Sequence, residues 1–305
     1  MGSDTTADDV LAGQDLTGHH ALVTGGTSGI GQEIARALAA VGADVLITGR
    51  DRNRGEAVAA RSTGKGRVGF AALDLADPAS IAAFPADRPF TILVLNAGVL
   101  TTGLTRTALG FETHFGVNHL GHFALTRRLP LAEARVVVLS SRAHRRADVD
   151  LADPNWRTRP FDRWRAYGQS KTANALFAAE LDRRTPHTAT AVLPGMVLTK
   201  IVRDFSDEQL RAEGWLDERG RPRVSAGWKT VRQAAASAVW AAVTPGLGGR
   251  IVEDCAPTAP WPTAHDLPAG HHLAYASDPA RAEALWELSE RLLADSHAPH
   301  IGNTV

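Results

Sequence analysis

The sequence of 305 residues has one cysteine, two tyrosines and four lysines. The lone cysteine, Cys255, excludes an intramolecular disulfide and a metal site built on a cysteine cluster. The 33 basic and 33 acidic side chains balance, which argues against the broad basic surface that nucleic-acid binding needs. No apolar run is long enough to cross a bilayer, and residues 1–17 lack the basic start and apolar core of a secretory signal. We therefore expect a cytoplasmic protein without a metal, nucleic-acid or membrane partner.

From His19 onward, short apolar segments alternate with helical patterns. Residues 20–24 are an apolar run that ends in glycines, and residues 29–41 carry apolar side chains at helical spacing. Buried strands that alternate with helices are typical of a parallel sheet covered on both faces. The sequence therefore predicts an α/β fold with a doubly wound parallel (Rossmann) sheet. Its strands are expected at residues 20–24, 43–48, 68–73, 90–95, 135–140 and 188–193.

A glycine-rich loop joins the first predicted strand to the first helix. Glycines in such a turn let the backbone approach a pyrophosphate, and the helix N-terminus supplies free N–H donors and partial positive charge. In this strand–turn–helix context the loop predicts dinucleotide binding rather than an ordinary turn. The expected cofactor contacts in the loop are Gly25, Thr27, Ser28, Gly29, Ile30 and Gly31.

The end of the second predicted strand bears on which dinucleotide binds. Sites for NAD usually place an acidic residue there, to bond the ribose 2′-hydroxyl. Gly49 stands in that position here, and the guanidinium of Arg50 follows, which can bind a 2′-phosphate in a forked geometry. The pattern favours NADP. In the competing interpretation, Asp51 holds the ribose and the cofactor is NAD.

The spacing of these segments indicates one domain with additions. Residues 18–254 are the predicted dinucleotide-binding domain, and residues 1–17 are expected to be a flexible leader. Residues 195–229 are irregular, with mixed charges and two tryptophans, which is typical of a substrate lid. Residues 255–305 form a predicted C-terminal extension, whose amphipathic helix at residues 280–293 is expected to pack on the same domain.

Tyr167 and Lys171 are four residues apart in a predicted helix, so their side chains share one face. A free tyrosine has a pKa of about 10, and a nearby ammonium favours the phenolate and lowers that value. The phenol can then exchange a proton with a substrate oxygen near neutral pH. Because tyrosine and lysine are so scarce in this chain, the pairing is informative. The alternative is a surface lysine beside a packed tyrosine.

These motifs, in this order, resemble the short-chain dehydrogenase/reductase superfamily over residues 17–254. The resemblance implies that Asp74 and Leu75 contact the adenine, and that Ser141 is a catalytic serine. It also implies that Asn118 holds a proton-relay water through Lys171. Further cofactor contacts implied by the family's NAG motif and nicotinamide segment are Asn96, Ala97, Gly98, Pro194, Gly195, Val197 and Thr199.

Local matches such as VNHLGHFALT and YGQSKTANALF resemble the retinol-dehydrogenase-like, or WW-domain-oxidoreductase-like, branch. That branch implies an NADP(H)-dependent oxidoreductase that interconverts a ketone or aldehyde with its alcohol, with a hydrophobic substrate expected. Leu95 replaces the first asparagine of the family's usual NNAG motif. The family also implies a homodimer or homotetramer, although the C-terminal extension leaves a monomer open.

The implied mechanism gives each residue one role. Tyr167 donates a proton to the alkoxide that hydride transfer creates, and Ser141 hydrogen-bonds the same oxygen. Lys171 holds the ribose hydroxyls of the nicotinamide and tunes Tyr167, while Asn118 supports a chain of waters. The alternatives are a C=C or C=N reductase or an epimerase on the same scaffold, or a regulator that senses the dinucleotide without catalysis.

Other candidate residues have structural interpretations. We read His265, His271 and His272 as solvated loop histidines, and Cys255 as a packed thiol. His144 either lines the site or packs within its loop. Four tryptophans flank the predicted site and favour either an apolar substrate pocket or simple packing: Trp156, Trp164, Trp215 and Trp228.

Overall fold

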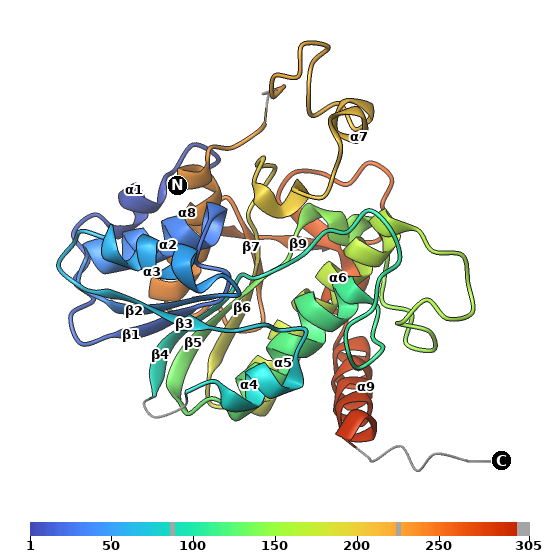
Figure 1. The fold of residues 1–305 in the computed structure, drawn as a ribbon, viewed down its shortest axis with the longest axis horizontal. Coiled ribbons are helices and arrows are strands. Elements are labelled where there is room, and N and C mark those ends of the chain that lie inside the picture. The colour runs from blue at the N-terminus through green and yellow to red at the C-terminus, as the bar shows by residue number, and fades with distance from the viewer. Residues whose placement is uncertain (86–88, 224–226, 298–305) are drawn as a thin grey trace.

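The computed structural model describes residues 1–85, 89–223 and 227–297. In these residues an eight-stranded sheet has the order β3-β2-β1-β4-β5-β6-β7-β8, and each pair is parallel except β7 with β8. The predicted doubly wound parallel sheet is confirmed (Figure 1). The strands are β1 His20–Val23, β2 Asp44–Gly49, β3 Val68–Ala72, β4 Phe90–Leu95, β5 Leu131–Leu139, β6 Thr188–Leu193, β7 Ile251–Glu253 and β8 Ala256–Pro257.

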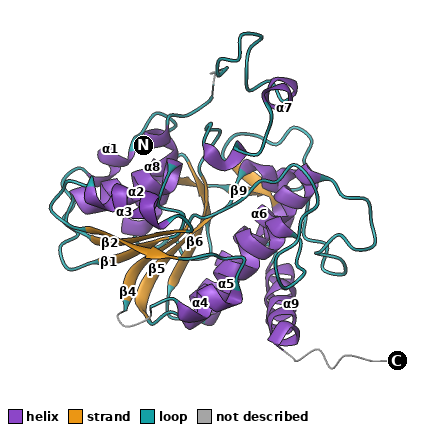
Figure 2. Cartoon of the chain, in the orientation of Figure 1, coloured by secondary structure: helices purple, strands orange, loops and turns teal. Residues whose placement is uncertain are grey.

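Helices cover both faces of this sheet, so its central strands are buried on both sides, whereas the edge strands β3 and β8 are partly exposed (Figure 2). One layer consists of α1 Ala7–Leu11, α2 Gly29–Ala40, α3 Arg52–Ala60 and α8 Val231–Val243. The other consists of α4 Pro78–Ala83, η1 His114–Leu120, α5 Gly121–Arg128, α6 Arg163–Arg184 and α9 Pro279–His297. Because β1 lies between β2 and β4, the chain order reverses there, and such a switch point opens a crevice at the carboxyl ends of the strands.

The expectation of a flexible leader over residues 1–17 needs correction. Thr6 and Asp9 form a capping box, in which each side chain accepts a hydrogen bond from the other residue's backbone N–H. The helix that follows, α1, buries Ala7, Val10 and Leu11 in the same core as α2 and α8. The acidic composition of the segment hid this apolar face, which occupies little more than one helical turn.

The segment predicted as a lid, residues 195–229, contains the short helices η3 Lys200–Val202 and α7 Asp207–Ala212. Residues 224–226 of that segment lie outside the described residues. Its two ends meet, because Met196 pairs with Trp228 and the backbone N–H of Lys229 donates to the Met196 carbonyl at 2.7 Å. The segment therefore leaves and returns to the domain at one place.

The C-terminal extension crosses to the α6 side of the sheet. It forms β9 Ala259–Trp261, β10 His271–Leu273, η4 Ala274–Ser277 and α9, and residues 298–305 lie outside the described residues. Trp286 of α9 packs edge-on to Phe123 at 4.8 Å between ring centroids. His272 is buried and bonded to Thr258 and Ser277, which corrects its reading as a solvated histidine.

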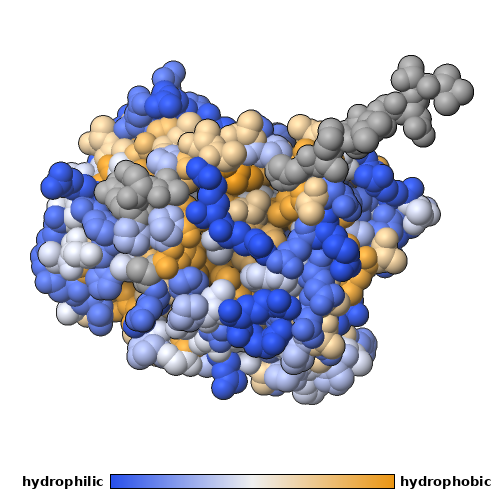
Figure 3. All heavy atoms as spheres, turned by 90° about the horizontal axis from the view of Figure 1, so that it is seen from below, coloured by the Kyte–Doolittle hydropathy of each residue, from blue (hydrophilic) through white to orange (hydrophobic). Residues whose placement is uncertain are grey.

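Figure 3 shows the lower face of the molecule, where hydrophobic residues are exposed among hydrophilic ones. A cavity of about 520 Å³ opens between α4, η1, α5 and the end of α9. Its apolar lining includes Ile81, Phe111, Leu120, Ala124 and Leu293.

Among the described residues, every helix is too short or too polar to cross a bilayer.

Candidate active site

The glycine loop after β1 packs tightly against the end of β4. A Cβ on Gly31 would lie 2.3 Å from the Asn96 amide nitrogen, and one on Gly25 would lie 2.9 Å from the Ala97 Cα. Gly25 also has a φ of +65°, which disfavours other residues. Ser28 precedes α2 without a side-chain capping bond, which leaves the N–H groups of the first turn to a ligand. The loop is thus a cradle that no other residue type fits at these two glycines.

Asn96 and Thr24 join the ends of β4 and β1. The Asn96 side-chain amide donates to the carbonyl oxygens of Thr24 at 2.8 Å and Gly25 at 3.3 Å. The Thr24 hydroxyl accepts the backbone N–H groups of Asn96 and Ala97. Asn96 therefore holds the backbone of the cradle in place from the end of β4.

A cavity of about 720 Å³ begins at this cradle and ends at α6. It passes the carboxyl ends of β2, β4 and β5, where a ligand is expected in a doubly wound sheet. Predicted site residues that line it are Gly25, Thr27, Ser28, Gly29, Ile30, Arg50, Asp74, Leu75, Asn96, Ala97, Gly98, Tyr167, Lys171, Pro194 and Thr199.

The structure does not bring every predicted residue to the cavity wall. Gly31 packs on Asn96, and a Cβ on Gly195 would meet the Lys229 side chain at 2.9 Å. Val197 is half-buried in the lid segment. Asn118 and Ser141 are not part of the wall: Asn118 is buried beside Gly98, and Ser141 is half-buried and hydrogen-bonded to Tyr167.

The side chains of Arg50 and Asp51, which follow β2, have different surroundings. Arg50 is exposed at the cavity, whereas the Asp51 carboxylate caps α3 by accepting the Arg54 backbone N–H at 3.0 Å. A Cβ on Gly49 would approach Thr27 to 2.8 Å, so this position has room for glycine only. Arg54 also lines the cavity and donates to the Thr27 carbonyl at 3.1 Å. Sequence reasoning missed Arg54, because Arg50 precedes the helix and no helical spacing links the two residues.

Tyr167 and Lys171 are both buried on one face of α6. The Lys171 ammonium lies 5.7 Å from the centre of the Tyr167 ring and donates to the Leu139 carbonyl at 3.0 Å. Burial raises the pKa of Tyr167 to about 12, against the opposing effect of its hydrogen bond with Ser141. Burial also lowers the pKa of Lys171 to about 8. The expected lowering of the tyrosine pKa is therefore corrected, since loss of solvent outweighs the hydrogen bond with Ser141.

Asn118 sits in η1, a π-helical segment, a geometry that is frequent at functional sites. Its side-chain oxygen accepts the Val99 N–H at 2.8 Å, and its amide nitrogen donates to the Ser170 hydroxyl at 3.0 Å. A Cβ on Gly98 would lie 3.4 Å from the Asn118 oxygen and 3.7 Å from the Lys171 nitrogen. The two side chains therefore converge on Gly98, and Asn118 ties the loop after β4 to α6.

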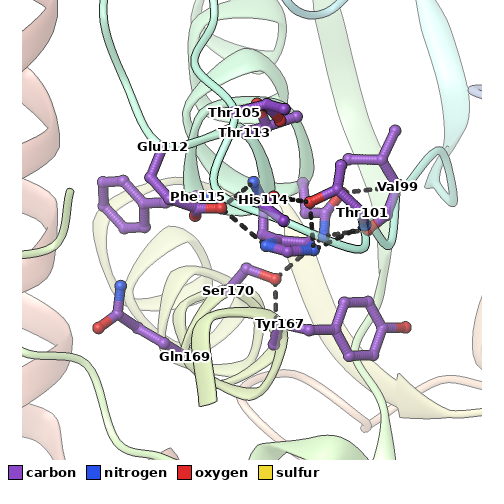
Figure 4. A network of polar contacts seen from close by, with 12 residues as sticks. Val99, Thr101, Thr105, Glu112, Thr113, His114, Phe115, Tyr167, Gln169 and Ser170 are labelled. Atoms are coloured by element: carbon purple, nitrogen blue, oxygen red, sulfur yellow. Dashed lines mark hydrogen bonds and ion pairs between the residues drawn. The ribbon is translucent and has the colours of Figure 1, made fainter. Parts of the chain in front are cut away.

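Figure 4 shows a buried polar network behind Tyr167 that sequence reasoning missed. The Glu112 carboxylate accepts the backbone N–H groups of His114 and Phe115 and the His114 Nδ1–H at 2.7 Å. Nε2 of His114 accepts the Thr101 backbone N–H at 3.0 Å, which places the ring proton on Nδ1, facing Glu112. That ring stands edge-on to Tyr167 at 5.9 Å between centroids. The network thus supports the tyrosine from the side of η1.

A second missed histidine, His122, connects the cradle to Asn118. Its Nε2 lies 2.8 Å from the Thr24 hydroxyl and its Nδ1 lies 2.9 Å from the Asn118 carbonyl. Burial lowers the pKa of His122 to about 4, so the ring is neutral at neutral pH. His122 therefore links the β1 end of the cavity to Asn118.

Comparison with known proteins identifies this arrangement. Residues 19–210 match the family model described as short chain dehydrogenase. The chain belongs to the short-chain dehydrogenase/reductase family. It is an oxidoreductase of a family that binds NAD(P) and acts on small molecules.

Two curated relatives place it more closely. A Streptomyces lividans protein named "Probable oxidoreductase" is 42% identical over 288 residues, which cover 90% of this chain and 97% of the relative. Human retinol dehydrogenase 12 is 38% identical over 297 residues, which cover 91% of this chain and 87% of the relative. The resemblance to the retinol-dehydrogenase-like branch is confirmed.

Two solved structures share the fold. An uncharacterized protein from Mycobacterium paratuberculosis is 32% identical, with a TM-score of 0.76 over 96% of this chain and 98% of that one. A short chain dehydrogenase from Burkholderia cenocepacia, in complex with NADP, is 26% identical, with a TM-score of 0.59 over 79% of this chain and 97% of that one.

Proposed function

We propose that the protein is an NADP(H)-dependent oxidoreductase that interconverts a ketone or aldehyde with the corresponding alcohol. The observation that carries the proposal is a single cavity that joins the glycine cradle to the buried Tyr167–Lys171 pair. The cradle fits a pyrophosphate, since its glycines admit no side chain and the first turn of α2 faces the cavity. When bound, the nicotinamide supplies or accepts the hydride.

The residues of the chain then have three tasks. In the reductive direction, the phenol of Tyr167 gives its proton to the substrate oxygen, and its high pKa keeps that proton in place until the oxygen becomes an alkoxide. Ser141 donates a hydrogen bond to the same oxygen. Lys171, with a pKa of about 8, is mostly protonated at neutral pH, and its charge stabilises the phenolate that remains. One hydride and one proton thus convert the carbonyl to the alcohol.

The side chains just after β2 support a preference for NADP over NAD. Asp51 also lines the cavity, but one of its carboxylate oxygens already caps α3 by accepting the Arg54 backbone N–H. Arg50 is exposed at the cavity and has no ion-pair partner in the part of the chain that the structure describes. Arg54 lies beside it, so two guanidinium groups can meet a 2′-phosphate. The positions of these two arginines at the cavity favour NADP over NAD.

A hydrophobic substrate is supported by the lid. Val202 and Phe205 of the lid form an apolar cluster with Leu100 and Tyr167. Trp164 and Trp215 extend this cluster, with 5.8 Å between their ring centroids. Trp156, by contrast, is buried beneath Arg159 and belongs to the core. Apart from Tyr167, these residues pack on one another rather than line the cavity, and an apolar cluster so close to Tyr167 favours aromatic or polycyclic carbonyl compounds.

The test is steady-state reduction of a panel of aromatic and polycyclic ketones with NADPH. We expect Tyr167→Phe to lower kcat by at least about a hundredfold, the usual scale of lost acid catalysis. With NADPH deuterated at its transferable position, the label should appear on the alcohol carbon of the product. Equal rates for wild type and Tyr167→Phe would refute the mechanism. Label on another carbon would indicate the C=C reductase alternative.

A further inference from the structure

His144 is a buried residue three positions after Ser141, in the short helix η2 Arg142–Arg146. It does not line the cavity, and both nitrogens of its ring already bond to other parts of the chain. Instead, its backbone N–H and its Nδ1 both contact the Ser141 carbonyl, at 3.0 Å and 2.8 Å. His144 therefore holds the backbone of Ser141 from two directions.

The other side of the same ring contacts the C-terminal extension. The Leu273 backbone N–H donates to Nε2 of His144 at 3.2 Å. Because that nitrogen accepts, the proton must be on Nδ1, where it is donated to Ser141. The His144 ring thus connects β10 to the serine loop, residues 141–147. With its proton on Nδ1, the ring donates to the Ser141 carbonyl and accepts the Leu273 N–H at the same time.

The backbone of His144 is held by the same extension. The Tyr275 hydroxyl donates to the His144 carbonyl at 2.6 Å, and the Thr172 hydroxyl, one residue after Lys171, lies 3.3 Å from it. Near this point, Arg281 of the extension forms an ion pair with Asp148. The extension therefore contacts the serine loop at the His144 ring and at the His144 carbonyl. Thr172 of α6 contacts the same carbonyl.

We propose that the C-terminal extension holds Ser141 in its reactive position through His144. His144 and Tyr275 are then positioning residues, which act on the substrate only by way of Ser141. The effect on rate rests on the proposed function, whereas the mechanical link between the extension and the serine loop does not.

The first experiment measures the mechanical link without any turnover. Hydrogen–deuterium exchange is followed in the peptide that spans residues 141–147, for wild type, Tyr275→Phe and Ser289→Ala. Ser289 is the matched control, because its hydroxyl also anchors α9 to the domain, at His119, but does not contact the serine loop. Loss of one net hydrogen bond should speed exchange about fivefold in Tyr275→Phe. Unchanged exchange in Tyr275→Phe would refute the link.

The second experiment is a double-mutant cycle in the reduction assay. Tyr275→Phe should lower kcat about threefold to tenfold, and His144→Asn at least tenfold, with the KM for NADPH unchanged. In the Ser141→Ala background, either substitution should change kcat less than twofold, because the group it positions is gone. Full additivity would show that His144 does not act through Ser141. If wild type reduces no ketone, the proposed function fails, while the exchange result still decides the mechanical link.

Discussion

Arg50 and Asp51 are neighbours in the chain, but the fold gives them different partners. The carboxylate of Asp51 is used by the backbone of α3, while the guanidinium of Arg50 faces the cavity. Sequence patterns named both as cofactor candidates, because a carboxylate after the second strand looks the same whether it bonds a ribose or caps a helix. The backbone bond to Arg54 separates these uses, and only the folded chain shows it.

Arg50→Ala tests that assignment. Removing one charge-assisted contact to a phosphate should raise the KM for NADPH about tenfold to a hundredfold and change the KM for NADH little. The matched control is Arg52→Ala, since Arg52 is an exposed neighbour that pairs with Glu56 and does not line the cavity. Equal weakening of both cofactors in Arg50→Ala would contradict the 2′-phosphate contact.

At the scale of elements, strands and helices could be predicted where apolar residues form short runs or repeat at helical spacing. The glycine loop and the Tyr167–Lys171 pair were found from spacing, because strand–turn–helix geometry and the helical repeat act locally. The contacts of His114 with Thr101 and of His122 with Thr24 were not found, because these partners lie on other segments of the chain. The pKa of Tyr167 was misjudged for a related reason: burial depends on everything packed around a side chain.

The histidines of η1 and α5 should make stability depend on pH. Burial lowers the pKa of His119 to about 3 and that of His122 to about 4, so both rings stay neutral in the fold. The unfolded chain takes up protons below about pH 6.5, where the folded chain does not. The stabilising contribution is therefore complete above that pH and is lost as the pH falls toward 4.

Urea unfolding at pH 7.5 and pH 5.5 measures this effect. We expect a smaller free energy of unfolding at pH 5.5 for wild type and a smaller pH difference for His122→Asn. His265→Asn is the control, because it makes the same substitution at an exposed histidine. An identical pH difference in wild type and His122→Asn would contradict the buried neutral ring.

At the scale of the whole molecule, α9 closes the side of the sheet that α5 and α6 form. Trp286 packs against Phe123 and Phe177, with Arg184 over its ring. Family resemblance implied a homodimer or homotetramer, but the outer side of α6 is in contact with α9 in this chain. We therefore expect a monomer, which sedimentation equilibrium measures directly.

Trp286→Ala tests how much the fold depends on α9. Loss of a large buried aromatic side chain should lower the free energy of unfolding by about 3–5 kcal/mol. Guanidinium unfolding gives this value, and Trp261→Ala serves as the control because Trp261 lies half-buried in the small sheet of β9 and β10. A change below about 1 kcal/mol in Trp286→Ala would show that α9 is only loosely attached.

The lid begins and ends at one anchored point, where Met196 pairs with Trp228. A loop whose ends are already joined can change in length and composition at little entropic cost to the rest of the fold. We therefore expect that the segment between these two residues can be exchanged for that of a relative while the cofactor site stays unchanged. A change in substrate preference in such a chimera would support the proposed role of the segment as a lid.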